Sequence, residues 1–168
     1  LESKLVSEVD KLIVCSEKDK LNFLPFIKKE NIFVIPNGVD TEFFVPKVNQ
    51  TAQPSLLFTG NMNYLPNREA VKHFICNIWP KILRSYPRSN FIIAGRNADG
   101  LKEKYSKYDN LTFYSSPEDM REIYDKAWIV VVPLLSGSGT RLKILEAMAM
   151  KKPVISTAVG AEGIDIKH

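Results

Sequence analysis

The pattern of apolar and polar positions becomes regular from residue 55 onward. Short apolar runs alternate there with longer segments whose apolar side chains recur at helical spacing. The apolar runs predict strands at 55–59, 90–94, 111–114, 128–135 and 153–157. The segments between them predict helices at 68–86, 101–107, 119–126 and 140–150, the first capped by Asn67 and kinked at Trp79-Pro80.

Strands that alternate with helices, and that are apolar enough to be covered on both faces, are typical of one fold class. This is the α/β class with a doubly wound parallel sheet, also called Rossmann-like. In such sheets the ligand binds beyond the carboxyl ends of the strands. The loops at those ends are 60–61, 95–96, 115–116 and 136–139. We therefore expect these loops to form one site at a single edge of the sheet.

Residues 1–50 follow a different pattern. The pattern there predicts strands at 11–15 and 32–36, with a helix between them at about 18–28. A Pro-Asn-Gly turn signal follows, and the polar segment 41–54, which contains two prolines, is typical of a linker. We place a boundary near residue 50, between an N-terminal segment of residues 1–50 and a domain of residues 51–168.

The most informative stretch begins with the small residues 136–139, which precede the helix predicted at 140–150. Thr140 is placed to cap this helix. Arg141 and Lys143 fall in its first turn, where the helix dipole by itself favours acidic residues. Backbone N–H groups, the positive end of the dipole and two cations therefore converge. This combination predicts an anion site, for phosphate or diphosphate.

Glu146 interrupts an otherwise apolar stretch of the same helix, from Ile144 to Met150. A half-buried carboxylate is costly unless something pairs with it, and the hydroxyl groups of a sugar-nucleotide would supply that pairing. Two alternatives stay open from the residues alone. The glycines can serve only a tight turn between strand and helix. Lys143 and Glu146, three residues apart, can form an ordinary surface pair.

Composition narrows the possible partners. The 168-residue chain carries a net charge of +4, with its basic residues dispersed, so we predict no nucleic-acid partner. Its two histidines are His73 and His168, and its two cysteines are far apart, which argues against a metal centre and suits free thiols in a reducing compartment. No Asp-x-Asp pair is present to hold a divalent ion. We therefore expect neither a metal nor a cofactor.

Targeting signals are also missing from the sequence. Its longest apolar run, 127–135, is much shorter than the ~20 residues of a transmembrane helix, and no signal peptide is recognisable. We expect a cytoplasmic protein, and peripheral association with the inner face of the membrane stays open. Because the chain starts at Leu1 rather than at a methionine, we expect it to be a piece of a longer protein.

Several motifs together carry a family resemblance. They are LIVCSE (12–17), VIPNGVDTEFFVP (34–46), LLFTGNMNYLPNREAV (56–71), FIIAGR (91–96), VVVPLLSGSGTRLKILEAMAMKKPVIST (130–157) and VGAEGI (159–164). In these motifs the chain resembles the group 1 family of retaining glycosyltransferases with the GT-B fold. The resemblance implies two Rossmann-like domains with an active-site cleft between them, of which the second binds the donor. It also implies that this chain is the tail of the first domain plus most of the second.

The resemblance assigns a role to Glu146, which matches the second Glu of the family's paired-glutamate motif and would hold the nucleotide ribose. The first Glu of that pair helps to hold the donor sugar in the family. Ser138 stands in its place, so we expect backbone groups of Gly137–Gly139 to hold the sugar.

Many family members also carry an Arg and a Lys after the first strand of this domain, both reaching the diphosphate. The corresponding loop, 60–64, has neither cation. We infer on physical grounds that Arg141 and Lys143 replace them as the catalytic cations. The other predicted donor-binding residues are Gly60, Asn61, Arg96, Ser115, Gly137, Ser138, Gly139 and Thr140.

The expected function is therefore a hexosyltransferase of glycan biosynthesis, with this chain as its donor-binding half and inactive alone. The enzyme would move a sugar from a nucleoside-diphosphate sugar to a glycan or lipid-linked acceptor, with retention and without a metal. Fixed N–H dipoles and cations would stabilise the charge of the leaving diphosphate. A non-catalytic sugar-nucleotide-binding module and a sugar-nucleotide epimerase of the same architecture stay open as alternatives.

Overall fold

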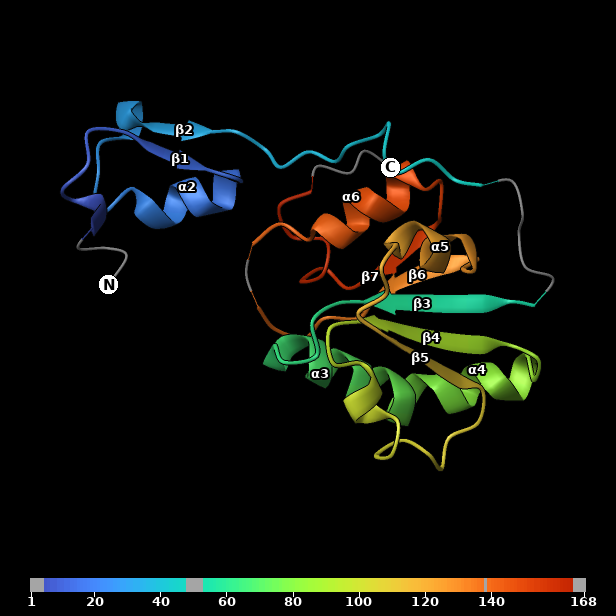
Figure 1. Cartoon of the computed structure of the whole chain (residues 1–168). Coiled ribbons are helices and arrows are strands. Elements are labelled where there is room, and N and C mark those ends of the chain that lie inside the picture. The colour runs from blue at the N-terminus through green and yellow to red at the C-terminus, as the bar shows by residue number, and fades with distance from the viewer. Residues whose placement is uncertain (1–4, 48–52, 138, 165–168) are drawn as a thin grey trace.

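The computed structural model describes residues 5–47, 53–137 and 139–164, and its centre is a five-stranded parallel sheet (Figure 1). The strands are β3 (Ser55–Thr59), β4 (Asn90–Gly95), β5 (Leu111–Ser115), β6 (Ile129–Val132) and β7 (Val154–Ser156). Their spatial order is β5-β4-β3-β6-β7. The chain therefore builds outward from β3 in one direction and then returns to build in the other. This is the predicted doubly wound topology.

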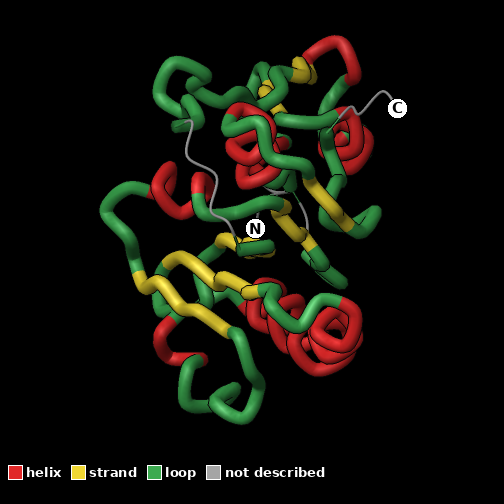
Figure 2. The backbone as a smooth tube through the Cα atoms, turned by 90° about the vertical axis from the view of Figure 1, so that its right-hand side faces the viewer, coloured by secondary structure: helices red, strands yellow, loops and turns green. Residues whose placement is uncertain are grey.

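Helices cover both faces of this sheet (Figure 1). One face carries the continuous rod of α3 (Leu65–His73), the π-helical segment η2 (Phe74–Ile78) and α4 (Trp79–Ser85), seen nearly end-on in Figure 2. The other face carries α5 (Met120–Asp125) and α6 (Leu142–Ala149). Right-handed crossovers require this change of face when the chain passes from β5 to β6.

The packing under the rod is aromatic. The Phe91 ring of β4 lies 4.6 Å from the Phe74 ring and 5.6 Å from the Trp79 ring, measured between centroids. Trp79 is fully buried, and its indole N–H donates to the Asp109 carbonyl at 3.0 Å. The π-helical segment ends immediately before Trp79-Pro80, where the sequence predicts a kink. Proline cannot donate the backbone hydrogen bond that a regular helix needs there.

Several predicted element ends were wrong, for local reasons. The first helix of the sheet domain begins at Leu65 rather than at Arg68, and Asn67 is a buried residue of its first turn, not its cap. The strand predicted at 128–135 ends at Val132, immediately before Pro133. Proline has no N–H group to donate to a strand ladder, so the strand stops there.

The helix predicted at 101–107 was also wrong. The structure has only a 3₁₀ turn, η3 (Asp99–Leu101), followed by further turns over 102–107. Leu101 and Tyr105 are the two side chains of this segment that are buried. So short a segment with so few apolar anchors does not repay the cost of nucleating a helix.

The N-terminal region forms a second small sheet, in which β1 (Leu12–Val14) and β2 (Ile32–Val34) are parallel. Between them lie α2 (Glu17–Phe23), capped by the Ser16 hydroxyl, and the 3₁₀ turn η1 (Lys29–Asn31). α2 ends well before the predicted residue 28 because Pro25 follows its last turn. The predicted boundary near residue 50 lies outside the described residues and stays a prediction.

The segment that follows β2 packs against α5. The Arg121 guanidinium lies 4.1 Å from the centre of the Phe43 ring and donates to the Phe43 carbonyl at 3.2 Å. The Phe44 ring meets the Tyr124 ring edge-on, at 6.3 Å between centroids. The region of the chain that precedes the sheet thus helps to support α5. Within the described ranges, no helix combines the length and the apolar character needed to cross a bilayer.

Gly95 allows the ends of β3 and β4 to meet closely. It adopts φ +127°, and an added Cβ would collide with the Gly60 carbonyl oxygen and lie 2.9 Å from the Gly60 carbonyl carbon. Gly95→Ala should therefore lower the free energy of unfolding by at least about 2 kcal/mol, through backbone strain and the clash. Urea titration followed by circular dichroism measures this loss.

Gly100→Ala is the matched control, because nothing lies within 4 Å of its added Cβ. That variant should change the free energy of unfolding by less than about 1 kcal/mol. Equal losses at the two positions would contradict the close approach of the strand ends.

Candidate functional site

The site begins at the carboxyl end of β3, where Gly60 leaves room for two polar side chains. An added Cβ at Gly60 would lie 3.0 Å from Lys143 Nζ and 2.7 Å from Asn67 Nδ2. The Asn67 amide donates to the Asn61 carbonyl at 3.0 Å. A residue with a side chain at position 60 would displace the ammonium and the amide. Glycine here therefore makes space for a charged group.

Lys143 crosses from the first turn of α6 to this strand end. Its ammonium donates to the Thr59 carbonyl and, at 3.3 Å, to Asn67 Oδ1. It also lies 4.3 Å from the centre of the Phe58 ring, a cation–π distance. The structure thus brings a cation from α6 to the 60–64 loop, which has none of its own.

Burial is the main influence on the Lys143 ammonium. Desolvation, followed by repulsion from Arg141, lowers the pKa of Lys143 to about 8, while the Glu146 carboxylate acts in the opposite direction. The group is charged at neutral pH, and it is close to losing its proton. An anionic ligand beside it would favour the charged form.

Glu146 lies one turn further along α6, and its carboxylate has a protein partner. The Tyr124 hydroxyl of α5 donates to Glu146 Oε2 at 2.7 Å and lies 3.3 Å from Thr59 Oγ1. Tyr124 is fully buried. Burial, and then the Glu146 charge, raise the pKa of Tyr124, so the phenol keeps its proton. Among the ion pairs of the described residues, none joins Lys143 to Glu146.

The glycine loop and Arg141 adjoin this cluster. Gly137 and Gly139 adopt φ +103° and φ +87°, which suits residues without a Cβ. An added Cβ at Gly137 would lie 2.9 Å from Arg141 Nη2 and 3.2 Å from the Tyr64 hydroxyl. The guanidinium therefore lies against the loop, on the same side as Tyr64. Ser138 lies outside the described residues.

The predicted cap of α6 was wrong. Arg141, with extended backbone at φ −91° and ψ 91°, occupies the cap position, and no side chain caps the helix. The Thr140 hydroxyl is buried and has no hydrogen-bond partner in the described part of the chain. An added Cβ at Gly163 would lie 3.0 Å from it. Thr140 thus faces the segment that follows β7 instead of the start of the helix.

Ser115 lies apart from this cluster, and Arg96 meets the neighbouring loop through its backbone. Ser115, at the end of β5, donates to Asp99 Oδ1 at 2.6 Å, and this bond lowers the pKa of Asp99. β5 is one of the two edge strands of the five-stranded sheet, and β4 separates it from β3. The Arg96 side chain is exposed, and its carbonyl accepts from the Met62 N–H at 2.8 Å. The structure therefore groups Gly60, Asn61, Lys143 and Glu146, with Ser115 outside the group.

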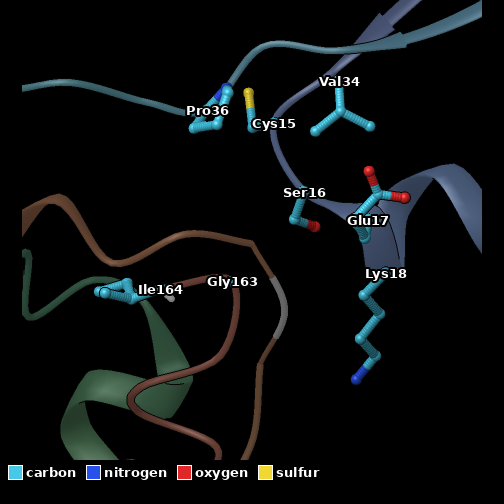
Figure 3. A pocket seen from close by; sticks show the side chains of 8 residues that line it. All are labelled: Cys15, Ser16, Glu17, Lys18, Val34, Pro36, Gly163 and Ile164. Atoms are coloured by element: carbon cyan, nitrogen blue, oxygen red, sulfur yellow. The ribbon is translucent and has the colours of Figure 1, made fainter. Parts of the chain in front are cut away.

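A cleft of about 570 Å³ opens beside the glycine loop (Figure 3). Cys15, Ser16 and Lys18 line it from the N-terminal region, and Gly163 and Ile164 line it from the segment after β7. An ion pair between Lys18 and Glu162 joins the two regions. An added Cβ at Gly163 would lie 3.5 Å from the Ser16 Cβ as well as near Thr140. The cleft is therefore next to the loop, although neither Lys143 nor Glu146 lines it.

Sequence reasoning did not find Tyr124, Thr59 or Asn67 as members of the site. Tyr124 fits the apolar face of α5, so its pattern indicates a core residue. Asn67 has the residue type and the position of a helix cap. A buried asparagine and a buried tyrosine hydroxyl both need hydrogen-bond partners. This need is the signal that could have indicated a polar cluster.

With this geometry established, comparison with known proteins decides the family. The family described as "Glycosyl transferases group 1" matches residues 53–167. The chain belongs to the group 1 glycosyl transferases. An uncharacterized 44.6 kDa protein in the cps region of Klebsiella pneumoniae is 32% identical over 122 residues, 68% of this chain and 31% of that protein.

Solved structures of GT-B glycosyltransferases share the fold of this group 1 member. A mutant of S. aureus TarM superposes with a TM-score of 0.72 at 18% identity, over 94% of this chain and 31% of TarM. Anabaena HepE superposes with a TM-score of 0.74 at 15% identity, over 95% of this chain and 48% of HepE. WaaG, a glycosyltransferase involved in lipopolysaccharide biosynthesis, superposes with a TM-score of 0.68 at 21% identity, over 90% of this chain and 45% of WaaG. The chain thus spans from about a third to half of the length of each of these proteins.

The lowered pKa of Lys143 predicts a pH dependence of stability. Its folded pKa is about 8, below the ordinary value of 10.5, so between these values the unfolded chain binds more protons. The free energy of unfolding should therefore rise, by about 1.5 kcal/mol, from about pH 8 to about pH 9.5. Urea titrations at several pH values measure the rise.

Lys143→Met removes the titrating group and should remove this rise. Lys81→Met, which alters an exposed lysine of α4, is the control and should retain it. If the free energy of unfolding of Lys143→Met still rose by the same amount over this pH range, Lys143 would not be the group that causes the rise.

Proposed function

We propose that this chain is the donor-binding part of a glycosyltransferase that takes a sugar from a nucleoside-diphosphate sugar. The observation that carries the proposal is the arrangement at the end of β3. The Lys143 ammonium is held there by Thr59 and Asn67, and the Glu146 carboxylate lies one turn further along the same helix. A cation beside Gly60 at a strand end suits a diphosphate, and a carboxylate suits the hydroxyl groups of a ribose.

The solved relatives support a nucleotide ligand of this kind. TarM was crystallised with UDP, and HepE with UDP-glucose. Both contain a domain with the fold of this chain. Their sequence identities to this chain are low, so the likeness is limited to the fold. We therefore choose UDP and uridine as probes. Thermal unfolding with UDP, GDP and ADP in parallel tests which base the site prefers.

The proposed chemistry uses fixed charges. When the bond between the sugar and the diphosphate breaks, negative charge grows on the leaving diphosphate. Lys143 and Arg141 would stabilise that charge without a metal, because they are in place before the reaction starts. Retention of configuration, a glycan or lipid-linked acceptor, and a cytoplasmic site at the inner face of the membrane belong to the same proposal. Retention and the acceptor rest on the family resemblance, and the location rests on the sequence alone.

One observation favours a second candidate function, a sugar-nucleotide-binding module without catalysis. Ser138 stands where the family resemblance places a donor-sugar contact. A module of this kind would bind the nucleotide and release no sugar. The epimerase alternative has less support, because His73 lies at the end of α3 and contacts Asn77 at 3.2 Å instead of the site.

Two substitutions on α6 should separate the proposed ribose and phosphate contacts. Glu146→Ala should weaken UDP and uridine alike, by about 1.5–3 kcal/mol, because it removes charged hydrogen bonds to hydroxyls. Lys143→Met should weaken UDP alone, and by less as salt rises, because added salt screens the attraction between charges. Titration calorimetry with both ligands measures the four changes.

Controls for these variants change the same residue types elsewhere. Glu103→Gln and Lys81→Met alter exposed side chains outside the site and should leave both affinities unchanged. If Lys143→Met weakened uridine as much as UDP, Lys143 would support the fold and not the phosphates. Unchanged UDP and uridine affinities in Glu146→Ala would overturn the ribose assignment.

We also expect this chain alone to bind the nucleotide without transferring sugar. It spans 31% of the cps-region relative and 48% of HepE, and transfer needs both substrates held together with water excluded. The test compares this chain with the whole protein to which it belongs, at equal concentrations of UDP-sugar and acceptor. Transfer by this chain at the rate of the whole protein would refute the proposal. A whole protein that binds without transferring would support the module, and a chelator should not slow the transfer.

A further inference from the structure

Lys143 and Glu146 carry opposite charges three residues apart on α6, yet they do not pair. This spacing brings two side chains together on one helix face, where a lysine and a glutamate ordinarily attract each other. Here each has another partner. The ammonium donates to the Thr59 carbonyl and to Asn67, and the carboxylate accepts from Tyr124. Something outside the helix therefore keeps the two charges apart.

The Tyr124 hydroxyl is suited to this task by its contacts. It lies 2.7 Å from Glu146 Oε2, and 3.3 Å from both Thr59 Oγ1 and the Lys143 carbonyl. A phenol has a single hydrogen to donate, and the shortest contact is the one to a charged acceptor. Glu146 therefore receives the hydrogen, through one oxygen. No hydrogen bond from the described residues reaches its other oxygen, Oε1, which stays available to a ligand.

The ring of Tyr124 is held from several sides. The residue is fully buried on α5, and the Phe44 ring packs edge-on against it at 84° between the planes. The neighbouring Phe43 is in turn held by Arg121 of the same helix. A phenol fixed in this way presents its hydroxyl at one place, and the carboxylate must come to it.

We propose that Tyr124 is a positioning residue that holds the Glu146 carboxylate away from the Lys143 ammonium. Each charge then stays available to a different part of one ligand, the carboxylate to ribose hydroxyls and the ammonium to the diphosphate. The assignment of those ligand parts rests on the proposed function. Without the hydroxyl, Glu146 turns to Lys143, and the ion pair that forms competes with both contacts.

Tyr124→Phe removes the hydroxyl and keeps the ring. Uridine affinity should fall about tenfold, since Glu146 loses its orientation, and UDP affinity should fall further, since Lys143 is partly neutralised. In a Glu146→Ala background the same substitution should leave uridine affinity unchanged, because no carboxylate remains to be positioned. Tyr105→Phe, which alters another buried tyrosine away from the site, should change neither affinity.

A second measurement does not depend on any ligand. Carbon-13 labelled lysine reports the titration of Lys143 by NMR, with Lys143→Met identifying its signal. The pKa of Lys143, about 8 in the unaltered protein, should rise in Tyr124→Phe, because the freed carboxylate approaches the ammonium. Thermal unfolding of each variant shows that the comparison is made on folded protein.

The outcomes separate the two proposals. Equal losses of uridine affinity with and without Glu146 would mean that Tyr124 acts through the fold, and would overturn the inference. An unchanged pKa of Lys143 in Tyr124→Phe would overturn it as well. If the protein bound none of the nucleotides while that pKa rose, the positioning role would stand and the proposed nucleotide function would fail.

Discussion

The close approach of α6 to the end of β3 is the constraint on which the rest of the site depends. Lys143 must cross from the helix to the Thr59 carbonyl, and the space it enters exists because Gly60 has no side chain. Gly95 extends the same constraint to β4, because its missing Cβ lets the Gly60 carbonyl come close. Two glycines at the ends of neighbouring strands thus determine where a charge is held.

That placement has an electrostatic cost, and the polar groups around it offset the cost. Moving an ammonium out of water favours its neutral form, which is why the pKa of Lys143 falls. The Thr59 carbonyl, the Asn67 amide oxygen and the face of the Phe58 ring each turn negative potential toward the charge. An added anion attracts an ammonium that is poorly hydrated more strongly than it attracts an ammonium in open water. Preorganised charge of this kind is what the departure of a diphosphate would use.

The N-terminal region contributes to the site indirectly. Phe43 and Phe44 follow the small β1–β2 sheet, and they pack on α5, the helix that carries Tyr124. The Lys18–Glu162 ion pair joins the same region to the segment after β7. The cleft between them lies beside the glycine loop, but it is not lined by the charges of α6. Support of α5 is therefore the direct link that the contacts provide.

The sequence by itself determined the architecture and indicated the chemical type of the candidate site. Apolar runs such as 55–59 predict the strands because a strand covered on both faces must be apolar throughout, and all five strands of the sheet were predicted. The glycine loop, the cations Arg141 and Lys143, and the carboxylate of Glu146 are readable from spacing along one helix. Element ends were predicted less well, because Pro25 and Pro133 stop their elements through local sterics that periodicity does not include.

Only the tertiary structure decided which partners these charges have. Lys143 and Glu146 are three residues apart, and spacing alone favours a pair between them. Their actual partners are Thr59, 84 residues from Lys143 along the chain, and Tyr124, 22 residues from Glu146. Contacts of that kind depend on how α5 and α6 pack on one face of the sheet. Local pattern carries no information about the distance between two elements, so the polar cluster became visible only in the folded chain.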